Sequence, residues 1–183
     1  MKKITIISLC IISAVFTIWY MHFEAPWTND GAISSIGLDH PALFIIWGVL
    51  TFSALTVSEL QCCKKERLKI ILPLIGISAL GMALTLIFRF DYDIKPDYYL
   101  HCTGSLLFSA AEGAAVFLIF FFNKNRVFSA ITALIMLGDL VFLFIFKENG
   151  LIETVPVFAG YIMLSLETLR KEKYEAARQT ENA

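Results

Sequence analysis

Residues 81–122, GMALTLIFRFDYDIKPDYYLHCTGSLLFSAAEGAAVFLIFFF, decide the fold. They contain the end of one apolar segment, an acidic loop and a second apolar segment. The second segment has about the twenty residues that a helix needs to cross a ~30 Å hydrocarbon layer. A run of this length in a soluble core would leave little polar surface for water. The stretch therefore predicts two membrane-spanning helices joined by a loop.

The second of these helices carries three polar residues on one face, His101, Ser105 and Glu112. At about 100° per residue, Glu112 returns to within about 20° of His101, and Ser105 lies about 40° away. The rise of ~1.5 Å per residue places Glu112 ~16 Å deeper than His101, near the middle of the membrane. A carboxyl group at this depth is costly if it faces lipid. We therefore expect Glu112 to point into a helix bundle and to form a hydrogen bond with a neighbouring helix.

The composition supports a membrane protein. Of the 183 residues, 57% are hydrophobic and 17% are charged, and 16 are Phe. A soluble domain averages about 45–50% apolar and about 25% charged residues. The net charge of −1 gives no overall basic character that would favour nucleic acid. The four cysteines lack the paired spacing of a zinc site, so we expect no metal and no cofactor.

The apolar blocks predict an all-α polytopic protein, a bundle of six transmembrane helices. The first block is longer than the apolar region of a signal peptide and lacks a cleavage site, so we expect it to remain as a helix. Residues 33–37 in the long first loop are expected to form a short interfacial helix. We assign residues 1–169 to one transmembrane domain and residues 170–183 to a polar cytoplasmic tail. The expected spans are residues 1–23, 41–58, 70–88, 99–122, 127–146 and 151–169.

The distribution of basic residues predicts the orientation. Cytoplasmic loops of membrane proteins are enriched in Lys and Arg. Only three of the 15 basic residues, Arg89, Lys95 and Lys147, fall on one side of the predicted membrane. This asymmetry predicts a multi-pass protein of the cell membrane with both termini in the cytoplasm. The twelve basic residues expected on the cytoplasmic side are Lys2, Lys3, Lys64, Lys65, Arg67, Lys69, Lys124, Arg126, Arg170, Lys171, Lys173 and Arg178.

All three histidines lie at the outer ends of predicted helices, near acidic loops. We expect some of His22, His40, Asp91 and His101 to lie near one another, where imidazole and carboxylate groups could perform acid–base chemistry. The alternative is that these residues only make the membrane interface polar. No HxxxH or HExxH spacing indicates a metal.

Asp139 in the fifth predicted helix lies at a depth similar to that of Glu112. The two helices are joined by a short turn and are therefore expected to be neighbours. The two carboxyl groups could share a proton. The alternative is that each is satisfied separately by a hydroxyl or a backbone carbonyl inside the bundle.

The order of three motifs resembles the Frag–DRAM–Sfk group of six-helix membrane proteins and a related bacterial family of unknown function. The motifs are ISSIG before Pro41, then GMALTLIFRFD, then HCTGSLLFSAAEGAAVFLIF. The resemblance covers residues 26–122 and does not extend to the last two helices or the tail. It implies a role in lipid organisation, lipid remodelling or scaffolding at membranes. Only His101 and residues 34–37 match positions of the family pattern.

These observations favour an integral membrane protein of lipid-organising, lipid-binding or scaffolding type, without demonstrable catalysis. Its expected partners are membrane lipids or a membrane protein, and not nucleic acid. One alternative is an intramembrane enzyme that acts on lipid through His101, Asp91 and Glu112, although no fixed nucleophile–base spacing indicates it. Another is a small proton-linked transporter that uses Glu112 and Asp139, although no internal repeat indicates it. The candidate ligand-binding residues are Ser105, Glu112, Asp139, His22 and His40.

Overall fold

The computed structural model describes the backbone of residues 3–181 and the side chains of residues 4–171. Helices joined by loops make up this part of the chain, which contains no strand. Six of its helices are long and apolar enough to cross a membrane, as the sequence predicts. The α-helices are α1 (Lys3–Tyr20), α2 (Ile33–Asp39), α3 (Pro41–Cys62), α4 (Leu68–Ile87), α5 (Lys95–Phe122), α6 (Arg126–Phe146) and α7 (Gly150–Glu181), with 3₁₀ turns at Met21–Phe23 and Lys65–Arg67.

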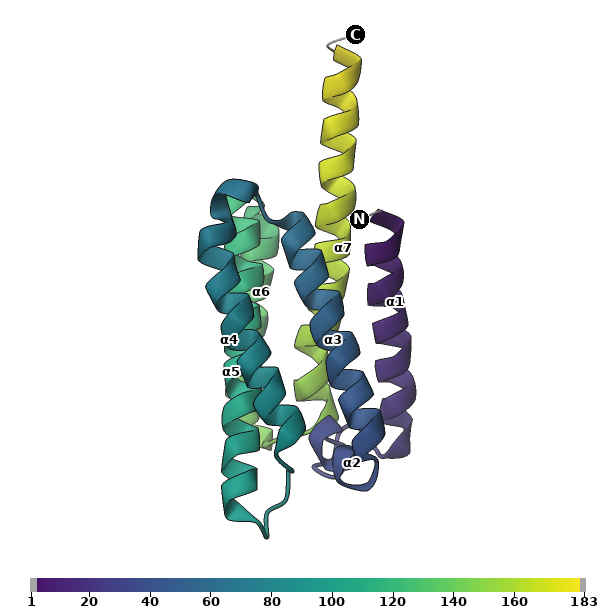
Figure 1. Ribbon diagram of the computed structural model, residues 1–183, viewed down its shortest axis with the longest axis vertical. Helices are drawn as coiled ribbons and strands as arrows, with labels where there is room; N and C mark the ends of the chain where they lie inside the picture. Colours follow the sequence, from purple (N-terminus) through teal and green to yellow (C-terminus); the bar gives the residue numbers. More distant parts are fainter. Residues whose placement is uncertain (1–2, 182–183) are drawn as a thin grey trace.

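The six long helices run up and down in one bundle (Figure 1). We call the end at which α1 begins and α7 ends the terminal end, and the opposite end, where α2 lies, the loop end. In the view of Figure 1, α4 and α5 lie on one side, α1 lies on the other, and α3 and α7 lie between them. Helix α7 continues beyond the other helices at the terminal end. The short helix expected at residues 33–37 is present as α2.

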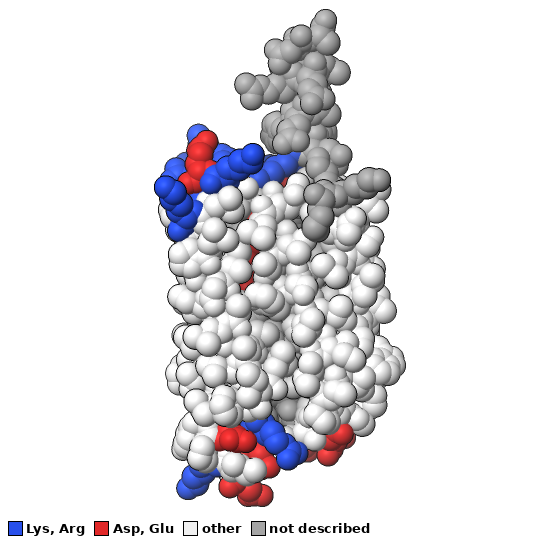
Figure 2. All heavy atoms as spheres, viewed as in Figure 1, with Lys and Arg blue, Asp and Glu red and all other residues white. Residues whose placement is uncertain are grey.

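Charged side chains gather at the two ends of the bundle, and a wide band separates them in which only a few Asp or Glu atoms are visible, between the helices (Figure 2). This distribution is compatible with an integral membrane protein that crosses the bilayer six times. Four of the twelve basic residues expected on one side, Lys2, Lys3, Lys173 and Arg178, lie outside the residues whose side chains are described.

Helices α4 and α5 approach each other most closely at two glycines. A Cβ atom added to Gly104 would lie 2.7 Å from the backbone oxygen of Gly81 and 2.7 Å from the backbone nitrogen of Thr85. A Cβ atom added to Gly81 would likewise meet the backbone of Phe108. Small residues allow two helix backbones to pack closely in a membrane. The two glycines therefore fix the position of α5, which carries His101, Ser105 and Glu112.

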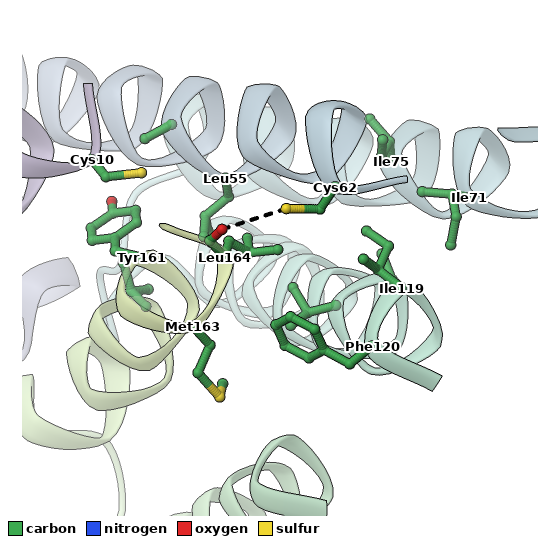
Figure 3. Close-up of a cluster of buried hydrophobic side chains, with 14 of the residues drawn as sticks. Cys10, Leu55, Cys62, Ile71, Ile75, Ile119, Phe120, Tyr161, Met163 and Leu164 are labelled. Carbon is green, nitrogen blue, oxygen red and sulfur yellow. Dashed lines mark hydrogen bonds between the residues drawn. The ribbon is translucent and has the colours of Figure 1, made fainter. Parts of the chain in front are cut away.

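The apolar core joins α1, α3, α4, α5 and α7. Figure 3 shows Cys10 of α1 and Tyr161 of α7 near Leu55 of α3, and Ile119 and Phe120 of α5 farther along the same cluster. The Cys62 thiol donates a hydrogen bond to the backbone oxygen of Leu164, at 3.4 Å. In contrast, only Ser129 and Thr132 of α6 are buried. Helix α6 thus packs more loosely than the other helices.

Three helices extend beyond the spans predicted for them. Helix α3 continues past residue 58 to Cys62, because Glu59 and Cys62 lie on its buried face. Helix α5 begins at Lys95 and not at residue 99, because Pro96 fits the first turn of a helix. Helix α7 continues past residue 169 to Glu181. The first difference matters most, since it places Glu59 inside the bundle.

Candidate functional site: a cavity with two polar clusters

A cavity of about 520 Å³ lies among α5, α6 and α7. Most of its lining is apolar, including Leu106, Met136 and Met163. Side chains from α3 and α4 close the remaining side. We call it the α5–α7 cavity. It has polar groups in two places, one at the loop end and one deeper in the bundle.

The cluster at the loop end, which we call the Ser34 cluster, consists of Ser34, His101 and Glu153. The Ser34 hydroxyl lies 3.0 Å from Nε2 of His101 and 2.8 Å from Oε1 of Glu153. All three residues line the α5–α7 cavity. They come from α2, α5 and α7, so the cluster exists only because the bundle brings three distant segments together.

Glu153 also stabilises the first turn of α2. Its Oε2 accepts hydrogen bonds from the backbone N–H groups of Ile33 and Ser34, the latter at 3.3 Å. The first N–H groups of a helix have no partner within the helix, and a carboxylate is favoured there. A residue of α7 therefore performs the capping role that a nearby side chain usually performs. This contact fixes Ser34 against His101.

His101 is held in one orientation. Its Nδ1 lies 3.0 Å from the backbone oxygen of Phe88, and its ring lies between the rings of Phe44 and Phe90, with centroid distances of 5.9 Å and 5.1 Å. Since a carbonyl oxygen can only accept, Nδ1 carries a hydrogen. Nε2 is therefore the nitrogen that is available to the Ser34 hydroxyl.

The Ser34 cluster has two arrangements of its protons. In the first, neutral His101 accepts the Ser34 hydroxyl hydrogen, and protonated Glu153 donates to the Ser34 oxygen. In the second, ionised Glu153 accepts from Ser34, and His101 donates from both ring nitrogens. Both arrangements hold the same number of protons. A proton can thus pass between Glu153 and His101 through the Ser34 hydroxyl without movement of the heavy atoms.

This geometry differs from the catalytic triad of serine hydrolases. In a triad the acid binds Nδ1 of the histidine and orients it toward the serine. Here the backbone of Phe88 occupies Nδ1, and Glu153 contacts the serine. Ser34 and His101 form a dyad, and the acid lies on the other side of the hydroxyl.

The deeper polar cluster contains Glu112, Ser78 and Glu59. The Ser78 hydroxyl donates to Oε2 of Glu112 at 2.6 Å. This confirms the prediction that Glu112 points into the bundle and forms a hydrogen bond with a neighbouring helix. The carboxyl group of Glu59 lies within hydrogen-bonding reach of Glu112. Glu59 is fully buried, whereas Glu112 also lines the α5–α7 cavity.

Asp139 is not the partner of Glu112. It is half-buried and lines the same cavity from α6. It makes no hydrogen bond or ion pair with another residue in the described part of the chain. Sequence reasoning missed Glu59 because it placed this residue in a cytoplasmic loop. A face of apolar and small residues that continues through Ala54, Leu55, Ser58 and Cys62 was the available signal.

The remaining candidate residues make other contacts. His22 is exposed in the 3₁₀ turn after α1, and its Nδ1 lies 2.9 Å from the backbone oxygen of Ile18 in α1. His40 packs on Phe23, with ring centroids 4.5 Å apart. Asp91 accepts a hydrogen bond from the backbone of Asp93, at 3.0 Å. The convergence of these residues with His101 therefore stays a prediction; the polar side-chain contact of His101 is with Ser34, which in turn contacts Glu153.

Ser105 is half-buried and lines the α5–α7 cavity on the same face of α5 as His101. Among the residues that the structure describes, no group of three or more His, Cys, Asp or Glu side chains could hold a metal ion.

No family model, no curated protein and no solved structure matches this chain.

Proposed function

We propose that this protein binds a lipid, or another amphipathic molecule, in the α5–α7 cavity within the membrane. The polar part of the ligand would contact the Ser34 cluster, and its apolar part would extend toward Met163. The observation that carries this proposal is the cavity itself, about 520 Å³ with a mostly apolar lining and polar groups at the loop end. Binding pockets for small molecules have volumes of about 300–1,000 Å³ and this same division of polar and apolar groups.

The packing of α6 supports entry of a ligand from the bilayer. Helix α6 forms one wall of the cavity, yet only two of its side chains are buried. Helix α6 already presents most of its apolar side chains to lipid, so moving it away from α7 would break few apolar contacts. The resemblance to the Frag–DRAM–Sfk group points to a lipid-related role as well.

We place the protein in the cell membrane with the terminal end in the cytoplasm. The excess of Lys and Arg at the terminal end supports this orientation. The Ser34 cluster then lies near the outer leaflet.

Native mass spectrometry of the protein purified in a mild detergent tests the proposal. We expect a lipid to remain bound to the unmodified chain and to be lost from Ser109→Trp, which fills the cavity. The matched control is Thr103→Trp, since Thr103 is also an exposed residue of α5 and does not line the cavity. Equal lipid retention by both variants, or no retained lipid in the unmodified chain, would contradict the proposal.

A second candidate is an intramembrane enzyme that acts on lipid esters. The observation that favours it is the 3.0 Å contact between the Ser34 hydroxyl and Nε2 of His101, next to the cavity. A fluorophosphonate probe tests it, because an activated serine displaces fluoride and forms a stable phosphonyl ester while its proton passes to the base. Labelling of Ser34 that disappears in His101→Gln would support the enzyme. If Ser34 is not labelled, the enzyme candidate is rejected and ligand binding remains the proposed function of the cavity.

A further inference from the structure

We infer that Glu59 and Glu112 form a proton-binding site that exchanges protons with the α5–α7 cavity. This inference goes beyond ligand binding and does not depend on it. It identifies the ligand of the deeper polar cluster as a proton that the two carboxyl groups share.

Three of the four carboxyl oxygens in the cluster have no hydrogen-bond donor among the described residues. Ser78 donates to one oxygen of Glu112. Both carboxyl oxygens of Glu59 and the other oxygen of Glu112 are buried and have no donor among the described residues. A buried polar atom without a partner costs about 1–3 kcal/mol, and more when it is charged. One proton placed between the two carboxyl groups supplies the missing donor.

Electrostatics leads to the same conclusion. Two carboxylates within hydrogen-bonding distance cannot both ionise in a medium of low dielectric constant. Neither Glu59 nor Glu112 forms an ion pair with a basic side chain in the described part of the chain. Protonation is therefore the available way to remove a charge from this site.

Few other titratable groups face the pair. Tyr161 of α7 lies near Glu112. Cys62 and Cys63 lie near Glu59. Asp139 of α6 lines the cavity that Glu112 also lines. From α4, the neutral Ser78 is the polar contact. None of these side chains is a cation. The Lys171 ammonium lies near Cys62 and Cys63, but it donates to the backbone oxygen of Cys62 and makes no ion pair with Glu59 in the described part of the chain, so it does not replace the proton.

The pair is reached from the α5–α7 cavity through Glu112. Glu112 lines the cavity, and Glu59 lies behind it, one helical turn from the end of α3 at Cys62. A proton that reaches Glu112 from the cavity can pass along the hydrogen bond to Glu59. From there about 5 Å of helix separates it from the terminal end.

A hydrophobic carbodiimide, dicyclohexylcarbodiimide, tests the inference on the full chain in detergent micelles. It reacts with a protonated carboxyl group in an apolar site: the proton moves to a carbodiimide nitrogen, the carboxylate adds to the central carbon, and an acyl shift leaves a stable N-acylurea. We expect peptide mass spectrometry to find one adduct per chain, on Glu112 or on Glu59, near neutral pH. Labelling should fall about tenfold per pH unit once the shared proton is lost.

The Gln variants sharpen the test. In Glu59→Gln the amide donates the hydrogen bond that the proton supplied, so we expect the adduct on Glu112 to be lost, and Glu112→Gln should protect Glu59 in the same way. Asp139→Asn is the matched control and should keep full labelling. Infrared spectroscopy provides a readout that needs no reagent access: the difference spectrum between the unmodified chain and either Gln variant should contain the C=O band of the protonated carboxyl group of the pair, whereas any band from Glu153 should cancel.

Three results would overturn the inference. The first is the absence of both the adduct and the infrared band at every pH at which the protein stays folded. The second is loss of labelling in Asp139→Asn, which would place the proton on Asp139. The third is protection by Na⁺ at constant pH, which would make the pair a metal cation site. An infrared band without an adduct supports the inference, since it shows the proton where the reagent does not reach.

Discussion

Glu153 connects three parts of the molecule through one carboxyl group. It binds the first turn of α2, the Ser34 hydroxyl and, through that hydroxyl, His101. Without it, two backbone N–H groups at the start of α2 would lose their partner. The position of α2 against the bundle therefore depends on a residue more than a hundred positions away in the chain.

Replacing Glu153 by Ala should destabilise the protein by about 1–3 kcal/mol, because buried donors at Ile33 and Ser34 would be left without an acceptor. Denaturant unfolding in detergent measures this loss. Glu24→Ala is the matched control, since Glu24 is exposed. An equal stability of the two variants would show that water replaces the carboxylate at no cost.

The sequence predicts the direction of Glu112 and not its partner. The cost of a carboxyl group facing lipid is a property of one residue, and it correctly placed Glu112 in the interior. The identity of the partner depends on which helices are neighbours. Chain order favoured Asp139 on the next helix, whereas Glu59 comes from α3, two spans earlier. For the same reason Ser34 and Glu153 could not be joined to His101 before the fold was known.

At the scale of elements, the contact between α4 and α5 positions both polar clusters. Gly81 and Gly104 allow the two backbones to contact each other. Ser78 on α4 can then donate a hydrogen bond to Glu112 on α5. The small residues were visible in the sequence as packing positions. The sequence did not show that Gly81 and Gly104 contact each other, because this depends on where the two helices cross.

Gly104→Ala should destabilise the bundle by about 1–3 kcal/mol, because the added methyl group would meet the backbone of α4, which cannot move without shifting the helix. Gly76→Ala is the matched control. A Cβ atom at Gly76 has nothing within 4 Å, and Ala favours a helix by about 0.5–1 kcal/mol over Gly. If thermal unfolding in detergent shows both variants to be equally stable, the close contact is not a determinant of the fold.

At the scale of the whole molecule, the two ends of the bundle differ in charge, and this difference sets the proposed orientation. The number of spans was predictable because it depends on the length of apolar runs. The cavity was not predictable, because it arises where α6 fails to fill the space beside α5 and α7.

The orientation predicts which cysteines react in intact cells. Cys63 is half-buried at the terminal end, and Asp93 is exposed in the loop between α4 and α5. A membrane-impermeant thiol reagent should label Asp93→Cys from outside and should label Cys63 only after the cells are opened. The reverse pattern would invert the proposed topology.

The pH dependence of the Cys63 reaction is a separate prediction. Burial raises the pKa of the Cys63 thiol, and the nearby Lys171 ammonium opposes this shift. Since the thiolate is the reactive form, its population should rise at a higher pH than for an exposed thiol. Alkylation rates of Cys63 should therefore lie on a curve displaced to higher pH than those of Asp93→Cys. Coincident curves would show that the thiol is not shielded from water.

The measurement that tests the binding cavity most directly is cross-linking with a photoactivatable phospholipid in liposomes, followed by peptide mapping. The account predicts adducts on cavity residues of α5, α6 and α7, such as Ser109, Met136 and Met163, and their loss when excess unmodified lipid is added. Adducts confined to the lipid-facing surface, such as Leu134 and Phe144 of α6, with none inside the cavity, would contradict it.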